Sequence, residues 1–182
     1  MPNFVVDQTV GASTLDEVIG FQQRAEQEPR GLLAGYWTPD DGRLLSVFES
    51  PEDGEPPEVA EGARVLPVLP ITADEYGPRD LQSQAANEDD LSLVLVRRQL
   101  DPLTDREFRA IALQAIMCAY EYSDMRWLRS YWSRSTDQLF CLFETSCHER
   151  VSEHARRSRI PCDEIHDAIE IRAGAPDALT RD

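Results

Sequence analysis

The chain of 182 residues carries a formal net charge of −16, and 41% of its residues are hydrophobic. That apolar content is typical of a globular protein and excludes a disordered one. The negative charge argues against non-specific binding to nucleic acid, because the phosphates would be repelled. Residues 1–10 lack the features of a secretory signal, and no apolar run approaches about 20 residues, so we expect a cytoplasmic protein without membrane contacts.

The first part of the chain predicts one helix and four strands in the order β-α-β-β-β. A strand over 3–10 precedes a helix over 14–27, for which Ser13 or Thr14 can serve as the cap. Pro39 and Gly42 predict a tight turn between the next two strands. Residues 51–62 are rich in Pro, Gly and acid and predict a loop. The remaining predicted strands cover 32–37, 44–50 and 65–71.

The later part of the chain predicts the complete order β-α-β-β-α-β. Thr104 and Glu107 form the sequence pattern of a capping box at the start of its first helix, which ends near Tyr122. The second helix is expected from Cys147 to Ser158, since Pro161 ends it. The strands are expected over 92–97, 126–132, 138–144 and 164–171.

These orders indicate an α+β fold made of two tandem ferredoxin-like repeats, of which the first is degenerate. The expected divisions are 1–71 for the first repeat, 72–91 for an acidic linker, 92–172 for the complete repeat and 173–182 for a flexible tail. The strand that opens the second repeat is apolar on both faces and therefore needs a cover on each face. We expect the other repeat to supply one cover, giving an intrachain pseudo-dimer.

A sequence repeat supports this division. Tyr36-Trp37, Leu44 and Phe48-Glu49 recur without a gap as Tyr131-Trp132, Leu139 and Phe143-Glu144, at a constant offset of 95 residues (36 to 131, 49 to 144). All three histidines and all four cysteines nevertheless lie in the second copy. We therefore predict one functional site per chain, in the second repeat.

Cys141 and His154 are the first candidates for that site. Cys141 has Ser46 as its counterpart and could be a nucleophile or a soft metal ligand beside a cation such as Arg129. Its alternative role is that of a small apolar core residue. His154 lies on one helical stripe with Val151 and could serve as a ligand or in proton transfer, or could be a half-buried histidine with one hydrogen-bond partner.

Three further residues could bind metal. Glu144 recurs as Glu49, which favours a structural role near a helix start over catalysis. His148 and His166 have carboxylates as sequence neighbours and could bind a borderline cation such as nickel or zinc, although the pattern favours a plain solvated histidine at both positions.

Aromatic residues on the predicted strands could line a pocket for a small ligand. Strict alternation places Trp127, Arg129 and Tyr131 on one face of the strand over 126–132. Tyr131 and Trp127 are therefore the candidate pocket residues.

The second copy resembles a family of small ferredoxin-like bacterial proteins for which nickel binding and dimerisation have been described. The matching runs are Arg126 to Tyr131, Phe140 to Glu144, Glu153 to Ala155 and Ile160-Pro161. The resemblance covers about residues 93–171 and, faintly, 3–71. Family members often have a histidine where this chain has Arg129. The resemblance implies a nickel-responsive protein and is compatible with association into a homo-oligomer.

Three functions remain open. The first is a non-enzymatic protein that binds a divalent transition metal such as nickel, with His154, His148, Cys141 and Glu144 as candidate ligands and no organic cofactor. The second is a cofactor-free enzyme of the dimeric α+β barrel kind, an isomerase or oxygenase acting on a small organic acid, in which His154 and Cys141 take part and Arg129 holds the anion. The third is an interaction module that docks partners on its acidic loops.

Overall fold

A computed structural model describes residues 3–11, 14–26, 31–49, 56–57, 59, 61–72 and 91–171. It has an α+β fold and divides into two compact units, one of residues 1–66 with 169–182 and one of residues 67–168. The expected loop over 51–62 lies largely outside the described residues, as do nearly all of the linker over 72–91 and the whole tail over 173–182. No helix among the described residues has both the length and the apolar character needed to span a membrane.

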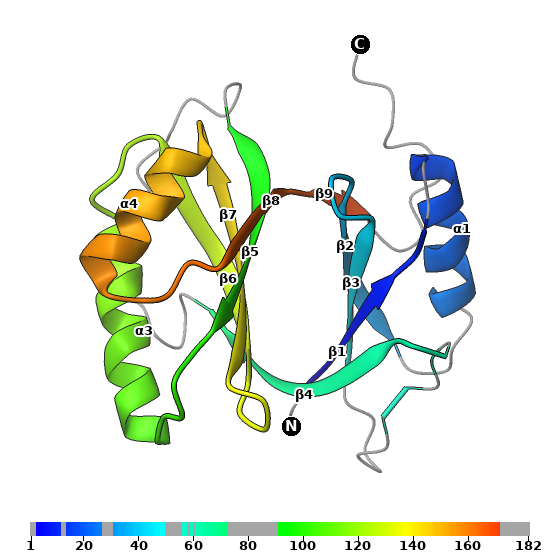
Figure 1. The fold of residues 1–182 in the computed structure, drawn as a ribbon, viewed down its shortest axis with the longest axis horizontal. Helices are drawn as coiled ribbons and strands as arrows, with labels where there is room; N and C mark the ends of the chain where they lie inside the picture. The colour runs from blue at the N-terminus through cyan, green and yellow to red at the C-terminus, as the bar shows by residue number, and fades with distance from the viewer. Residues whose placement is uncertain are drawn as a thin grey trace. The chain divides into compact units, whose positions relative to one another are not determined.

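The second unit has the predicted order of elements. Its strands are antiparallel and adjacent in the order β8-β5-β7-β6. Helices α3 and α4 lie against one face of this sheet (Figure 1). The elements are β5 (Ser92–Gln99), α3 (Asp105–Ala119), β6 (Met125–Ser133), β7 (Gln138–Thr145), α4 (His148–Ser158) and β8 (Glu164–Asp167).

The first unit repeats this arrangement with one described helix. Its strands follow the order β4-β1-β3-β2, which matches β8-β5-β7-β6 position for position. Helix α1 packs against β2. The elements are β1 (Asn3–Thr9), α1 (Leu15–Glu26), β2 (Leu32–Thr38), β3 (Arg43–Phe48) and β4 (Arg64–Ile71).

Each unit also receives a fifth strand, which pairs with its second strand. In the first unit, β9 (Ile169–Ile171) pairs with β2, and Ile169 lies opposite Trp37. In the second unit, the end of β4 pairs with β6, and Leu69 lies opposite Trp132. Trp132 is the repeat counterpart of Trp37, so the two added strands have the same register. The strand predicted over 164–171 is therefore two strands, which separate at Ala168.

A β-bulge occurs at the same place in both units. The pairing of β2 with β3 shifts between Leu32 and Ala34, and that of β6 with β7 shifts between Trp127 and Arg129. Both shifts obey the offset of 95 residues found in the sequence (32 to 127). A bulge inserts one extra residue and exchanges the faces of the residues on either side. The repeat is therefore a repeat of backbone geometry as well as of sequence.

Capping boxes start the first helix of both units. The hydroxyl of Thr104 accepts from the backbone N–H of Glu107 (3.4 Å), and the Glu107 carboxylate accepts from the N–H of Thr104 (2.9 Å). Thr14 and Glu17 exchange the same two bonds at 3.4 and 3.2 Å. The two capping boxes are 90 positions apart (14 to 104), whereas the strand motifs of the ungapped match are 95 positions apart. The helix starts therefore repeat at a different offset from the strands.

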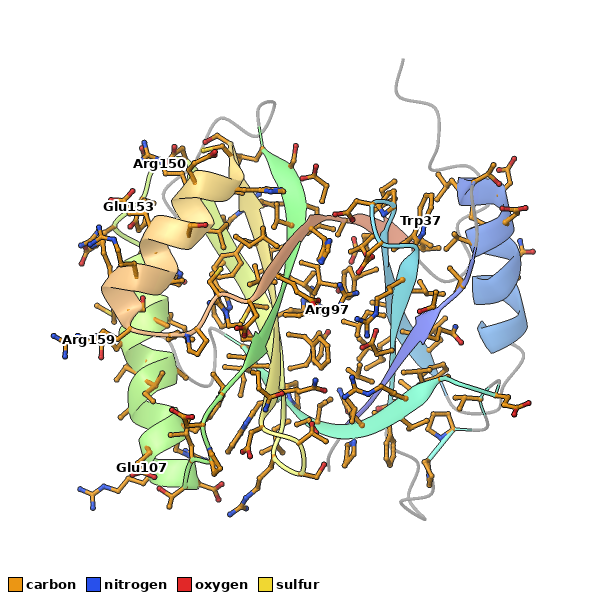
Figure 2. All side chains as sticks on the ribbon, viewed as in Figure 1. Trp37, Arg97, Glu107, Arg150, Glu153 and Arg159 are labelled. Atoms are coloured by element: carbon orange, nitrogen blue, oxygen red, sulfur yellow. The ribbon has the colours of Figure 1, made fainter. Side chains whose placement is uncertain are left out.

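The second unit has the larger described core. Phe108 of α3 stacks on Trp132 of β6 with ring centroids 3.8 Å apart and an interplanar angle of 7°. Val151 and Ala155 of α4 are buried on the same side of the sheet. On the solvent side of α4, Arg150 donates to Glu153 (3.2 Å), and both are marked in Figure 2. The core of the first unit beneath α1 is formed by Val18, Trp37, Leu44 and Ile171.

Candidate functional site

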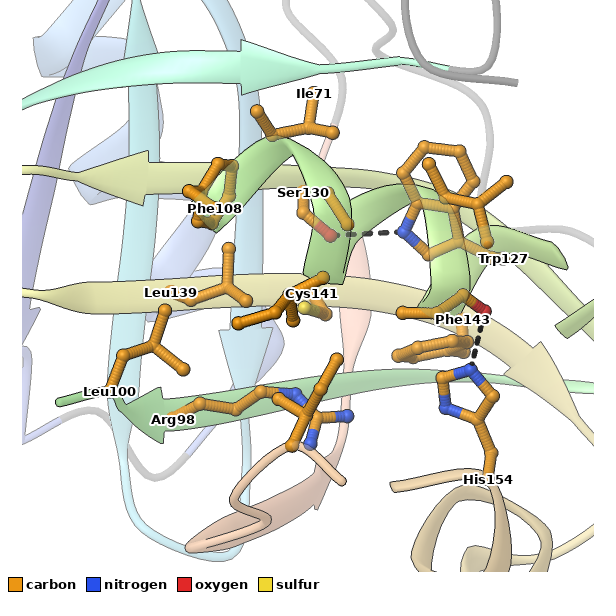
Figure 3. Close-up of a pocket in the computed structure, with 15 residues that line it drawn as sticks. Ile71, Arg98, Leu100, Phe108, Trp127, Ser130, Leu139, Cys141, Phe143 and His154 are labelled. Carbon is orange, nitrogen blue, oxygen red and sulfur yellow. Dashed lines mark hydrogen bonds between the residues drawn. The ribbon is translucent and has the colours of Figure 1, made fainter. Parts of the chain in front are cut away.

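A small pocket lies in the second unit between the sheet and its two helices. Its volume is about 40 Å³, which is room for roughly two or three water molecules. The lining is mostly apolar and includes Leu100, Phe108 and Ile116. Four polar side chains interrupt this lining, each from a different strand or helix: Arg98, Ser130, Cys141 and His154. Figure 3 shows these four around the pocket.

His154 is buried, with 2% of its surface exposed, and its lowered pKa favours the neutral imidazole. Its Nε2 lies 2.8 Å from the carbonyl oxygen of Ala115 on α3. A carbonyl can only accept, so Nε2 carries the proton and Nδ1 presents a lone pair. Burial lowers the pKa of His154, and the charges of Arg98 and Arg157 lower it further against the opposing effect of the Ala115 bond. The Nδ1 lone pair has no partner among the described residues.

Arg98 brings a positive charge to the same pocket. Only 3% of its surface is exposed, and its Nη1 donates to the carbonyl oxygen of Pro161. Its Nε–H has no partner among the described residues. Figure 3 shows Arg98 extending into the pocket from β5, and His154 entering it from α4 with its imidazole on the dashed bond to Ala115.

Cys141 lies in the pocket, 5% exposed, opposite Val96 on β5 and Ser130 on β6. Trp127 also lines the pocket, and its indole Nε1–H donates to the hydroxyl of Ser130 at 3.0 Å. The sequence alternation had placed Trp127 on the face opposite to Ser130. The β-bulge after Trp127 corrects that assignment, because the extra residue returns the indole to the helix-covered face.

Three other candidates lie away from the pocket. Tyr131 and Arg129 are not among its lining residues; Tyr131 is buried, whereas Arg129 is exposed and pairs in register with Leu142 rather than with Cys141. Glu144 forms an ion pair with Arg126 across β6 and β7, in which the Arg126 Nε donates to the carboxylate at 2.7 Å. The positive group near Cys141 is therefore Arg98 rather than Arg129.

The remaining histidines, His148 on α4 and His166 on β8, do not line the pocket. The Nε2 of His148, at the start of α4, is 2.8 Å from the Oδ1 of Asp167, at the end of β8, and both side chains are exposed. His166 of β8 lies 3.7 Å from the carboxylate of Glu164. Thus the four proposed metal ligands do not form one group: His154 and Cys141 share the pocket, whereas His148 and Glu144 lie elsewhere.

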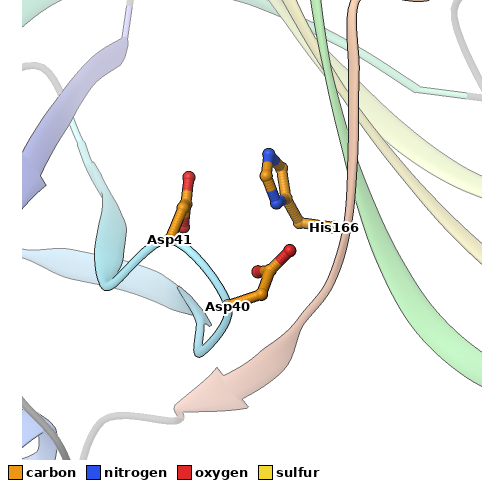
Figure 4. Close-up of side chains that lie close together, drawn as sticks. All are labelled: Asp40, Asp41 and His166. Atoms are coloured by element: carbon orange, nitrogen blue, oxygen red, sulfur yellow. The ribbon is translucent and has the colours of Figure 1, made fainter.

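Figure 4 draws His166 with Asp40 and Asp41 of the turn between β2 and β3. The two aspartates belong to the first unit and His166 to the second. Asp41 has its own role in the turn, since its carboxylate accepts from the backbone N–H of Arg43 at 3.2 Å.

Sequence reasoning missed Arg98 and Asp167. The signal for Arg98 was present, because Val94, Val96 and Arg98 alternate onto one face of the opening strand. The sequence prediction ended that strand at Arg97, whereas β5 continues to Gln99. Asp167 had no comparable signal, since its approach to His148 depends on how α4 packs beside β8.

Comparison with known proteins supports the resemblance in the second repeat. Residues 95–167 match the family described as "Nickel responsive protein SCO4226-like". The match lies within the 93–171 region identified from the sequence motifs and confirms that resemblance there. No curated protein matches the chain.

The comparison with solved structures finds two matches, and both are described as "putative monooxygenase". The one from Lactobacillus acidophilus NCFM has a TM-score of 0.51 and 11% sequence identity, and the alignment covers 93% of each chain. The one from Fusobacterium nucleatum has a TM-score of 0.48 and 12% identity over 94% of this chain and 92% of the other. At this identity, the first likeness supports the α+β fold and carries no information on activity.

Proposed function

We propose that this chain is a non-enzymatic protein that binds a divalent transition metal, with nickel as the first candidate. The match of residues 95–167 to a nickel-responsive family supports the proposal. His148 and Asp167, both within the matched region, supply the donors. Imidazole nitrogen suits nickel, copper and zinc, and a carboxylate is a common additional ligand.

The observation that carries the proposal is the distance of 2.8 Å between the His148 Nε2 and the Asp167 Oδ1. Two ligand atoms that each lie about 2.1 Å from one metal, at a right angle, are about 3 Å apart. The pair could therefore bind a metal with little rearrangement. Both side chains are exposed, so water can complete the coordination. Two protein ligands with water predict weaker binding than at a closed structural zinc site.

The other candidate ligands suit a cation less well. In the pocket, His154 and Cys141 lie beside the guanidinium of Arg98, whose charge would repel a divalent ion. Glu144 is already paired with Arg126. We therefore place the metal at His148 and Asp167, and retain His154 and Cys141 as pocket residues.

Isothermal titration of the full-length chain with Ni²⁺, Cu²⁺, Zn²⁺ and Mg²⁺ would test the proposal. We expect the three transition metals to bind and Mg²⁺ not to bind. His148→Ala and Asp167→Asn should each weaken nickel binding at least tenfold. His166→Gln is the matched control, because it removes a histidine from the neighbouring strand position.

Two outcomes would refute this assignment. Absence of nickel binding to the unaltered chain would remove the function itself. Loss of binding in His166→Gln, with unchanged binding in His148→Ala, would keep a metal function but move the site away from the His148–Asp167 pair.

A further inference from the structure

Two buried polar atoms in the pocket of the second unit have no partner among the described residues. One is the Nε–H of Arg98, a donor, and the other is the Nδ1 of His154, an acceptor. The residues are 97% and 98% buried by surface area, since 3% and 2% of each remain exposed. Buried polar atoms in native proteins are nearly always hydrogen-bonded to protein or to a bound molecule. The pocket is thus a place where a ligand would complete two bonds.

The charge of Arg98 points to an acidic ligand. The guanidinium contacts the Pro161 carbonyl and the thiol of Cys162, and no carboxylate in the described part of the chain forms an ion pair with it. A buried guanidinium without a counter-ion is costly, because a charge removed from water requires compensation. An anion in the pocket would provide that compensation.

The lone pair of His154 narrows the choice of ligand. The groups that face this imidazole are Arg98 from β5, Arg157 from α4, Tyr122 from the segment after α3 and Phe143 from β7, and none of these is a carboxylic acid. A simple anion would accept a hydrogen bond from Arg98, but it would be repelled by the lone pair on the Nδ1 of His154. A carboxyl group that shares one proton with Nδ1 satisfies both, because it accepts from Arg98 and bonds to His154 through that proton.

The size and lining of the pocket limit the rest of the ligand. A volume of about 40 Å³ accepts a few heavy atoms and excludes a ring system. The surrounding side chains of Leu100, Phe108 and Ile116 favour an apolar body. Acetate and propanoate meet these limits, whereas longer acids do not.

We propose that this pocket binds a short-chain monocarboxylic acid, whose carboxyl group lies between Arg98 and His154. Around neutral pH the free acid is ionised and His154 is neutral. The complex therefore takes up one proton, which the carboxyl group and the imidazole share. This site is separate from the proposed metal site, so failure of either proposal leaves the other standing.

The test is a titration of the full-length chain with sodium propanoate at constant ionic strength. Propanoate at twenty times its Kd should raise the thermal unfolding midpoint by about 4 °C. Because one proton is taken up, its affinity should fall about tenfold per pH unit between pH 6 and 8. Sodium hexanoate should bind at least tenfold more weakly, since it exceeds the pocket, and sodium chloride should give no shift.

Variants separate binding from folding. Arg98→Met removes the charge but keeps much of the shape, so propanoate binding should be lost while thermal stability is kept or raised. His154→Gln should weaken binding and abolish its pH dependence. Arg97→Met is the matched control, because Arg97 is the adjacent buried arginine on the opposite face of β5; it should bind propanoate normally.

Two results would overturn the proposal. Absence of any propanoate effect on the unaltered chain would mean that water alone satisfies the two atoms. Loss of stability in Arg98→Met, with unchanged propanoate affinity, would mean that Arg98 supports the fold rather than a ligand.

Discussion

The two units share a backbone plan and differ in what lies beneath their helices. Both have the same strand order, the same bulge and a capping box at the first helix. At matching register positions, Arg98, Ser130 and Cys141 of the second unit replace Gln8, Gly35 and Ser46 of the first. The two units thus have the same hydrogen-bonding frame, whereas the side chains able to take part in chemistry lie in the second unit.

The largest expected difference concerns the cores. Phe108→Ala removes the ring that stacks on Trp132 and should destabilise the protein by about 3–5 kcal/mol. Val18→Ala in the first unit should cost about 1–2 kcal/mol, because less buried volume is lost. Urea unfolding followed by circular dichroism measures both. Equal losses would show that the two cores contribute alike.

The next difference concerns Asp7 and Arg97, which occupy the same register position in the two units but carry opposite charges. Asp7 of β1 is buried and pairs with Arg43, whose Nε donates to it at 3.2 Å, whereas Arg97 of β5 reaches Glu164 only at 3.9 Å. Asp7→Asn should cost about 2–3 kcal/mol, since it leaves a partly buried arginine without its partner.

Glu164→Gln is the matching change in the second unit. It should cost less than about 1 kcal/mol, because Glu164 is half exposed. The denaturant guanidinium chloride is a salt and would screen both ion pairs. Urea titration at low ionic strength is therefore the appropriate measurement. A larger loss in Glu164→Gln than in Asp7→Asn would contradict the assignment of the stronger pair to the first unit.

A smaller effect is expected at the two capping boxes, where the units should behave alike. Thr104→Ala and Thr14→Ala should each cost about 1 kcal/mol, because each leaves a helix N–H without its acceptor. Thr104→Ser, which keeps the hydroxyl, is the control and should cost little. A large loss at one box with none at the other would show that only one helix depends on its cap.

The smallest effect is a pH dependence that arises from Asp124 in the second unit. The hydrogen bond from Arg150 (2.8 Å) lowers the pKa of Asp124, and a bond from Ser146 contributes as well. A lowered folded-state pKa stabilises the protein above the ordinary aspartate pKa, and that stability is lost as the pH falls through the lowered value.

Asp124→Asn should therefore lower stability at pH 6 and make less difference at pH 3. Urea midpoints across this range provide the measurement, with Asp137→Asn as the control. A constant difference between Asp124→Asn and the unaltered chain at all pH values would argue against the ion pair as the cause.

The sequence predicted the elements well where a local pattern determines them. The capping box at Thr104, the turn at Pro39 to Gly42 and the stripe of Val151 and His154 on α4 are all present in the structure. Such features depend on neighbouring residues, so their physics is visible within a few positions.

Features that depend on distant partners were not predictable in this way. Strict alternation cannot reveal the bulges after Leu32 and Trp127, which exist only in relation to the paired strand. The pairing of β9 with β2 joins segments that are more than 130 residues apart. The intrachain pseudo-dimer, the interaction-module function and association into homo-oligomers stay predictions.

The placement of β9 has a practical consequence for anyone who divides this chain. A fragment that stops before Ile169 lacks the strand that pairs with Gly35 to Trp37, and the backbone groups of β2 on that edge become unpaired. An uncovered strand edge invites pairing with other molecules. Shortened forms used for crystallisation or labelling should therefore keep residues up to at least Ile171, or they will tend to self-associate.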